Sequence, residues 1–239
     1  MPGIEIVNNS IIDDFIAPVC EDHLAILYQD DDILLINKPS GLLSLSGKNP
    51  CNWDSVHYRL VNGQLGLTAP FPQAKLPHRL DFGTSGIMAV ALNDYALKQL
   101  NKQFQDGIIK KQYLAVLQGS LEADQGQICV PIAKDKSIFP RVKICKGTGK
   151  SAVTEYRVLK RLESPQRTLV QFTPLTGRTH QLRIHSHFIG NPILGCDLYH
   201  AEQSELKAER LLLHASTLCF QHPVSGISIE QQCSCPFVL

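Results

Sequence analysis

A short stretch between residues 77 and 86 holds the densest group of side chains that could do chemistry. It reads Pro-His-Arg-Leu-Asp-Phe-Gly-Thr-Ser-Gly, which places a cation, a carboxylate and two hydroxyls beside two glycines. Glycines let such a loop hold a carboxylate rigidly while its backbone approaches a ligand. Asp81 is therefore a candidate catalytic carboxylate. The alternative is an aspartate that only caps a turn by accepting backbone N–H bonds.

A second stretch, residues 176–187, places two arginines and three histidines around the start of an expected helix. Arg178 would stand at the helix N-terminus and Arg183 a little over one turn further on, although a surface helix with ordinary cations fits the same pattern. The three histidines raise the alternative of a metal site. Residues five apart on a helix point well away from each other, however, and the HExxH pattern is missing, so we expect no metal. The histidines are His180, His185 and His187.

Three weaker signals lie elsewhere in the chain. Tyr113 follows two lysines in an expected strand, where a tyrosine most simply packs in a core or an interface. Residues 211–215 read Leu-Leu-Leu-His-Ala, which is typical of a buried strand with one satisfied histidine. Residues 141–150 contain several basic residues and no acid, so Arg141 and Lys143 are candidate phosphate contacts. The spacing of a P-loop is absent.

The elements that must position these groups are predicted by apolar periodicity and turn residues. Strands are expected at 25–28 and 33–37, joined by an aspartate-rich turn, and at 87–92 and 111–118. Helices are expected at 53–60, from Asn93 or Asp94 to Gly107, and at 180–188 with Thr179 as its cap. Residues 127–175 read mostly as strand and turn, and 211–221 with 227–232 as a final hairpin. The fold class is α+β, a mixed and mainly antiparallel sheet with flanking helices.

Charge is distributed unevenly along the 239 residues. The first 32 residues contain eight acidic residues and no Lys or Arg, which leaves 23 basic against 14 acidic residues in the remainder, a balance of +9. A basic body behind an acidic leader fits a polyanionic partner, whereas a merely solvated basic surface is the simpler alternative. We treat residues 1–24 as an acidic N-terminal extension and 25–239 as the catalytic domain.

Several classes of protein are not indicated. The acidic N-terminus does not resemble a signal peptide, and no apolar run approaches the roughly 20 residues that span a membrane. We therefore expect a cytoplasmic protein with no membrane partner. The eight cysteines are scattered without a CxxC pair, so neither a disulfide framework nor structural zinc is expected. The sequence indicates no oligomer interface, and a monomer is the expectation.

The motifs taken together resemble one family. Lys-Pro-Ser-Gly at 38–41, HRLDFGTSG at 78–86, KKQYLAVLQG at 110–119, TGRTHQLRIH at 176–185 and LLLHA at 211–215 look like the successive motifs of RluA-type RNA pseudouridine synthases. The resemblance runs from about residue 25 to residue 236. It is most similar to the short branch, which has no N-terminal S4 RNA-binding domain. The resemblance implies the pseudouridine synthase catalytic fold and a reaction without cofactor or metal.

It also implies roles for individual residues. Asp81 would be the catalytic carboxylate, with Arg178 paired to it, although Arg183 could be the basic partner instead. Tyr113 would stack on the uracil and assist removal of its C5 proton, and Leu213 would form an apolar wall. Arg79 would fill the gap that the flipped uridine leaves in the RNA. Further substrate contacts are expected from His78, Thr84, Lys111, Arg183, Arg141 and Lys143.

The implied substrate is a uridine in structured RNA. The short branch implies a stem-loop of 23S ribosomal RNA and a tRNA anticodon stem-loop as candidates. Unpaired loops reduce the cost of extruding the target base, which is a few kcal/mol. Two rival hypotheses remain: a catalytically silent RNA-binding module, which would not depend on Asp81, and a metal-dependent hydrolase that uses the histidines at 180–187.

Overall fold

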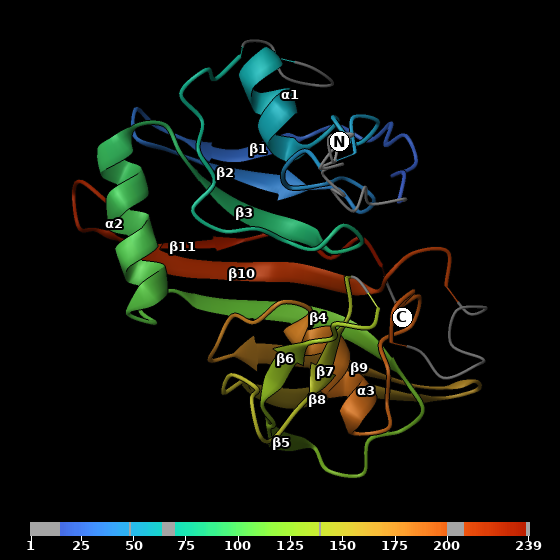
Figure 1. Cartoon of the computed structure of the whole chain (residues 1–239). Coiled ribbons are helices and arrows are strands. Elements are labelled where there is room, and N and C mark those ends of the chain that lie inside the picture. The colour runs from blue at the N-terminus through green and yellow to red at the C-terminus, as the bar shows by residue number, and fades with distance from the viewer. Residues whose placement is uncertain (1–14, 48, 64–69, 139, 200–207, 238–239) are drawn as a thin grey trace, which may run out of the picture.

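The computed structural model describes residues 15–47, 49–63, 70–138, 140–199 and 208–237. Its centre is one long, mixed and mainly antiparallel sheet flanked by three described helices, which confirms the α+β class (Figure 1). The helices are α1 (Val56–Asn62), α2 (Asp94–Gln105) and α3 (Gln181–Phe188). The strands of the large sheet are β1 (Ala25–Gln29), β2 (Ile33–Lys38), β3 (Ser85–Ala91), β4 (Lys110–Gln118), β5 (Gln125–Cys129), β8 (Val153–Glu163), β9 (Gln166–Pro174), β10 (Leu213–Gln221) and β11 (Ser228–Gln232). A separate small hairpin joins β6 (Ile132–Lys134) to β7 (Val142–Ile144).

The strand order of the large sheet is β1-β2-β3-β10-β4-β9-β8-β5, and β11 pairs with β10 outside this path. Among the described pairs, only β3 and β10 run parallel. This pair lies in the middle of the sheet and joins strands that are more than 100 residues apart in the chain. Figure 1 shows β10 running between a half that contains β1–β3 with α1 and a half that contains β4, β8 and β9 with α3.

The first half is covered on both faces, which explains the unbroken apolar runs of β2 and β3. Leu34 and Ile36 of β2 face α1, where they pack with Val56 and Leu60. The alternate positions of β2 and β3 face α2 and pack with its residues Ala96 and Leu100. A strand with both faces buried reads as a continuous apolar segment because its side chains alternate between two cores.

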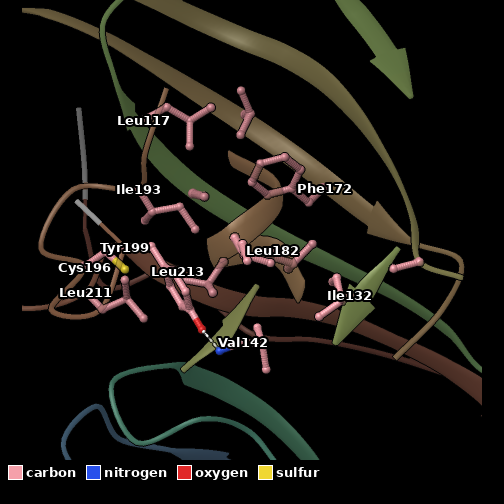
Figure 2. Packing of buried hydrophobic residues seen from close by; sticks show 14 of the residues in the cluster. Leu117, Ile132, Val142, Phe172, Leu182, Ile193, Cys196, Tyr199, Leu211 and Leu213 are labelled. Carbon is pink, nitrogen blue, oxygen red and sulfur yellow. Dashed lines mark hydrogen bonds between the residues drawn. The ribbon is translucent and has the colours of Figure 1, made fainter. Parts of the chain in front are cut away.

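The second half has a core of its own, shown in Figure 2. Phe172 of β9 and Leu182 of α3 pack there with Ile132 and Val142 of the β6–β7 hairpin. The segment that leads into β10 contributes Leu211 and Leu213 to the same cluster. Tyr113 of β4 packs against this core and against the core under α1, so it stands where the two halves meet.

The N-cap predicted for α2 is confirmed, and the one predicted for α3 is wrong. Asn93 caps α2 as predicted, because its side chain accepts a hydrogen bond from Ala96 N. Thr179 does not cap α3. The cap position is His180, which has a left-handed backbone (φ 52°) and makes no side-chain cap bond. A side chain of the helix itself holds the preceding loop in place of a Thr179 cap. Gln181, the first residue of α3, accepts hydrogen bonds from Thr176 Oγ1 and Arg178 N through its side-chain oxygen.

The expected boundary at residue 25 does not coincide with a break in packing. Residues 15–24 have no regular secondary structure, yet Cys20 and Leu24 are buried in the core under α1. Arg59 of α1 is fully buried, and its guanidinium donates to the backbone carbonyls of Cys20 and Asp22. The part of the acidic extension that is described therefore lies on the body of the protein.

All eight cysteines lie in described residues and all are free thiols. Within the described ranges, no helix has the length and apolarity needed to cross a bilayer.

The parallel pairing of β3 with β10 depends on Gly86. Gly86 lies opposite Ala215 and has φ +113°, a backbone conformation that side chains with a Cβ rarely adopt. A Cβ at this position would stand 2.2 Å from the carbonyl oxygen of Ala215 and 2.6 Å from its nitrogen. Both atoms belong to the backbone, so they cannot move aside without separating the two strands.

We expect Gly86→Ala to destabilise the protein strongly, by about 3 kcal/mol or more, through strain and backbone clash together. This corresponds to a fall in Tm of about 6–12 °C for a domain of this size, measured by circular dichroism. Gly226→Ala is the matched control, because Gly226 also has a positive φ (+71°) but no atom within 4 Å of the added Cβ. A Gly86→Ala protein as stable as the Gly226→Ala protein would contradict this account.

Candidate active site

A cavity of about 1040 Å³ lies across the middle of the sheet, at the border between its two halves. This volume is at the upper end of the range for small-molecule sites, and it leaves room for a nucleotide and its neighbours. The cavity is lined by nine of the eleven residues predicted from the sequence, namely His78, Arg79, Asp81, Thr84, Lys111, Tyr113, Arg178, Arg183 and Leu213. Arg141 and Lys143 are not among its described lining residues.

Strand register explains why residues so far apart in sequence meet here. β3, β10, β4 and β9 are consecutive neighbours in the sheet. Ala215 of β10 pairs with Gly86 of β3 on one side and with Tyr113 of β4 on the other, and Tyr113 pairs in turn with Phe172 of β9. The loop before β3 and the segment after β9 therefore open onto the same region of the sheet. These two segments carry Asp81 and Arg178.

The loop that carries Asp81 is fixed through its backbone carbonyls. Ser44 Oγ donates to Leu80 O (2.7 Å), Gly41 N donates to Phe82 O (3.0 Å), and Ser40 Oγ donates to Gly83 O (2.7 Å). All three donors belong to the turn that follows β2. The Lys-Pro-Ser-Gly motif thus has a structural role, since it holds the backbone that follows the carboxylate, while Ser44 holds the residue before it.

Lys38 is at the centre of this contact. It is fully buried, and its Nζ donates to Pro39 O (2.8 Å), Leu42 O (2.7 Å) and Phe82 O (3.2 Å). Burial lowers the pKa of Lys38 to about 7, and attraction to Cys20 and Asp81 opposes this shift. Three carbonyl acceptors match the three N–H donors of an ammonium group. The buried cation therefore bridges the turn and the loop.

Asp81 itself lies in the cavity with its side chain 23% exposed. Its backbone carbonyl accepts from Thr84 N (3.1 Å), which closes the turn behind it. Burial raises the pKa of Tyr113 and the charge of Asp81 raises it further, so the Tyr113 hydroxyl stays protonated at neutral pH. Asp81 and Glu155 supply the carboxylates among the described lining residues, and Glu155 is exposed.

The structure separates the two candidate arginines. Arg178 is exposed, its Nε donates to Ser151 O (2.9 Å), and among the described residues it forms no ion pair with Asp81. Arg183 is buried and forms an ion pair with Asp197. Burial disfavours its charge, but attraction to Cys196, Asp197 and Asp81 raises the pKa of Arg183. Asp81 is thus among the charges that act on Arg183, and which arginine is the partner of Asp81 in the reaction stays a prediction.

The remaining predicted residues of the cavity have more local contacts. His78 Nε2 accepts from Ala89 N (2.9 Å), and burial together with the charge of Lys111 lowers the pKa of His78 to about 3. His78 is thus a neutral group that supports the loop. Lys111 Nζ lies 5.9 Å from the centre of the Phe104 ring, and burial lowers its pKa. Thr84 and Leu213 are buried in the wall.

Other polar side chains of α3 hold the helix in place. Gln181 Nε2 donates to Val153 O (2.9 Å), and His185 contacts Thr154 Oγ1 (2.9 Å) through Nδ1. His180, His185 and His187 do not belong to the one group of described residues with metal-ligand spacing, which consists of Asp30, Asp32 and His222. His222 Nε2 is already 2.9 Å from Asp30 Oδ2 in that group.

The basic stretch at 141–150 lies next to the cavity rather than in its lining. The Arg141 guanidinium stands 5.4 Å from the centre of the Tyr199 ring. Lys143 is exposed and lies 3.7 Å from Asp135. The histidine in the Leu-Leu-Leu-His-Ala segment is satisfied as predicted, because His214 Nδ1 pairs with Ser85 Oγ (2.8 Å) and Nε2 with Cys233 O (3.3 Å).

Sequence reasoning missed three residues of this region. Lys38 was noted only as part of a motif, and His180 only as a potential metal ligand. Tyr199 lies in a segment without a motif, so no sequence signal pointed to it. Its hydroxyl is 2.9 Å from His180 Nδ1, and His180 Nε2 is 3.9 Å from Asp81 Oδ1.

Comparisons with known proteins agree on one family. The sequence model of the family described as RNA pseudouridylate synthase matches residues 32–188. The chain is 43% identical over 214 residues to the dual-specificity RNA pseudouridine synthase RluA of Yersinia pestis, which covers 90% of this chain and 100% of that protein. It is 42% identical to the protein of that name from Escherichia coli K12, over 89% of this chain and 93% of the relative. Among solved structures, human RNA pseudouridylate synthase domain containing 1 superposes with a TM-score of 0.75 at 30% identity, over 92% of this chain and 87% of that one.

Removal of the buried ammonium tests how the Asp81 loop is held. We expect Lys38→Met to lower stability by about 2–4 kcal/mol, because three carbonyls lose their donor inside the protein. Amide hydrogens of residues 80–84 should then exchange with solvent faster, as measured by mass spectrometry. Lys98→Met, at an exposed position of α2, is the control and should change stability by less than about 0.5 kcal/mol. If amide hydrogen exchange at residues 80–84 were unchanged in the Lys38→Met protein, the hydrogen bonds of Lys38 would not be needed to hold the Asp81 loop.

Proposed function

The chain belongs to the RluA-type RNA pseudouridine synthases and is an isomerase that makes pseudouridine in RNA, and we propose that Asp81 is its catalytic carboxylate. The observation that carries this proposal is the environment of Asp81. The carboxylate lies in the cavity beside an aromatic side chain, Tyr113, and an apolar one, Leu213, and it is coupled in charge to buried Arg183. The only other described carboxylate of the lining, that of Glu155, is exposed.

The reaction requires one carboxylate and an enclosed pocket. The N1–C1′ bond of uridine breaks, the uracil turns, and C5 joins C1′. C5 loses a proton and N1 gains one, so the product is an isomer and neither an oxidant nor a cofactor is needed. Glycoside hydrolases use a second carboxylate as general acid, but uracil is a tolerable leaving group without it. Asp81 acts in its ionised form, either by attacking the sugar or by removing a sugar proton.

The neighbours of Asp81 suit this chemistry. Arg183 brings a positive charge into the buried site of Asp81, and attraction to Asp81 is one of the causes that raise the pKa of Arg183. Tyr113 presents a ring for the uracil to stack on, and its raised pKa means that it enters the reaction as a neutral phenol. Leu213 and Tyr113 exclude water, which would otherwise trap the sugar after the base has left.

The substrate proposed is a uridine in a stem-loop, as in 23S ribosomal RNA and a tRNA anticodon arm, and the relatives from Y. pestis and E. coli are both named dual-specificity. Extrusion of the base costs a few kcal/mol, and less in a loop than in a duplex. Arg79 is exposed at the cavity and can fill the vacated place in the RNA. Lys110 and Arg178 are also exposed there, and Arg141 and Lys143 extend the basic surface toward the flanking phosphates. We place the reaction in the cytoplasm, with the protein as a monomer.

Replacement of Asp81 tests the proposal. Asp81→Asn keeps the size of the side chain and removes its charge, so we expect a fall in rate of at least 10²–10⁴-fold, on the order of the contribution of one acid–base group. The measurement is tritium release from uridine labelled at C5, in a ribosomal RNA stem-loop and in a tRNA anticodon stem-loop.

Asp124→Asn is the matched control, because Asp124 is 83% exposed and pairs with Arg161 outside the cavity lining. It should release tritium at the wild-type rate. If wild type released none from either RNA while still binding them, the catalytically silent binding module would be favoured. If Asp81→Asn released tritium at the wild-type rate, the carboxylate would be assigned wrongly.

Replacement of Arg183 and of Arg178 tests which arginine is the partner of Asp81. We expect Arg183→Lys to lower kcat at least about 10-fold, because a lysine lacks the planar fork that contacts Cys196 and Asp197 together. Arg178→Lys should lower kcat less than about 3-fold, because an exposed contact to a phosphate needs only the charge. Single-turnover assays on one stem-loop would measure both. The opposite order of effects would restore Arg178 as the partner of Asp81.

A further inference from the structure

His180 has a strained backbone beside Asp81. With φ 52°, it is the one described residue other than glycine with a positive φ. Such a conformation costs about 1–3 kcal/mol and persists only where the surroundings impose it, often at functional sites. The ring of His180 does not cap α3. It is 9% exposed and contacts two groups, the hydroxyl of Tyr199 and the carboxylate of Asp81.

Tyr199 is fixed on several sides. Its hydroxyl accepts a hydrogen bond from Val142 N (2.7 Å), which is drawn as the dashed line in Figure 2. The guanidinium groups of Arg141 and Arg183 lie 5.4 and 5.6 Å from the centre of its ring. Burial raises the pKa of Tyr199 to about 12, so the hydroxyl keeps its proton at neutral pH. The β6–β7 hairpin and α3 together hold this side chain.

The hydrogen bonds favour one position for the proton of His180. A backbone N–H can only donate, so the Tyr199 oxygen accepts from Val142 and its own proton is free to be donated. The second partner of Tyr199, at 2.9 Å, is Nδ1 of His180. Among the described residues the Tyr199 hydroxyl has no other hydrogen bond, so the arrangement that uses its proton makes Nδ1 the acceptor, and a neutral imidazole then carries its own proton on Nε2. Nε2 is the atom that lies 3.9 Å from Asp81 Oδ1.

The charges around His180 are consistent with a neutral ring. Burial lowers the pKa of His180, and attraction to Asp81 and Asp197 opposes this while Arg183 and Arg79 reinforce it. A neutral N–H donor stabilises a carboxylate without placing a second cation beside it. The distance of 3.9 Å exceeds that of a hydrogen bond, but catalytic hydrogen bonds are often long before the substrate is bound.

We propose that His180 is a positioning residue for Asp81, held by Tyr199 as the tautomer that presents Nε2–H to the carboxylate. The inference rests on the proposed role of Asp81 in the reaction. One oxygen of Asp81 is then held by His180 when the substrate closes the site, and the other faces the ribose. Tyr199 is not among the described residues that line the cavity, and its hydroxyl acts on Asp81 through His180.

The tautomer can be measured without any enzyme assay. Long-range ¹H–¹⁵N NMR spectra of the full chain, labelled at histidine, distinguish the two neutral tautomers from the imidazolium. We expect His180 of the wild type to be the neutral Nε2–H form at pH 7.5, and Tyr199→Phe to reduce the population of that form. His180→Asn assigns the signal, because asparagine tolerates a left-handed backbone. A wild-type His180 that is an imidazolium or carries its proton on Nδ1 would overturn the inference.

Kinetics test the consequence for Asp81. Both His180→Asn and Tyr199→Phe should lower kcat about 10–100-fold, the order of effect expected for a misplaced catalytic group, with KM changed less than about 3-fold. The controls are His57→Asn and Tyr58→Phe on α1, which contributes no described residue to the cavity, and both should retain wild-type kcat. Thermal melting must show that each variant is folded.

The outcomes distinguish the two proposals. If Asp81→Asn is inactive while folded His180→Asn and Tyr199→Phe keep wild-type kcat, the positioning role is wrong and the proposed function stands. If Asp81→Asn keeps wild-type activity, the proposed function is wrong whatever the tautomer of His180. A fall in kcat for both variants together with the Nε2–H tautomer in the wild type supports the positioning role.

Discussion

The site depends on one interaction above all, the contact between the buried ammonium of Lys38 and backbone carbonyls that include that of Phe82. A carboxylate on a loop is useful only if the loop is rigid, and backbone carbonyls can be held only by donors. The turn after β2 supplies those donors from Lys38, Ser40, Gly41 and Ser44. Two segments that are about 40 residues apart in the chain thereby become one rigid support.

The second constraint is the close approach of β3 and β10 at Gly86. A parallel pair in the centre of the sheet joins the half that carries the Asp81 loop to the half that carries α3. With β4 and β9 as the next neighbours, Tyr113 stands at the border of both cores. The cavity arises because two separately packed halves meet along these strands, each contributing one wall.

The polar residues around the start of α3 have two different roles. Gln181 and His185 hold the helix against β8. His180 and Arg183 face the region of Asp81 and are coupled in turn to Tyr199 and Asp197. The helix can be largely buried although it carries many polar groups, because the buried side chains of Gln181, Arg183, His185 and Ser186 each have hydrogen-bond partners.

The sequence by itself determined the α+β class, the apolar strands β2 and β3, the cap of α2 and nine of the residues that line the cavity, because periodicity, caps and motifs are local properties. Only the tertiary structure decided that Arg183 is buried in an ion pair with Asp197 while Arg178 is exposed, and that His180 rather than Thr179 is the N-cap of α3. It also brought Tyr199 to the site from a segment without a motif. These features follow from packing between distant segments, where burial and hydrogen-bond partners are set by neighbours that the local sequence does not specify.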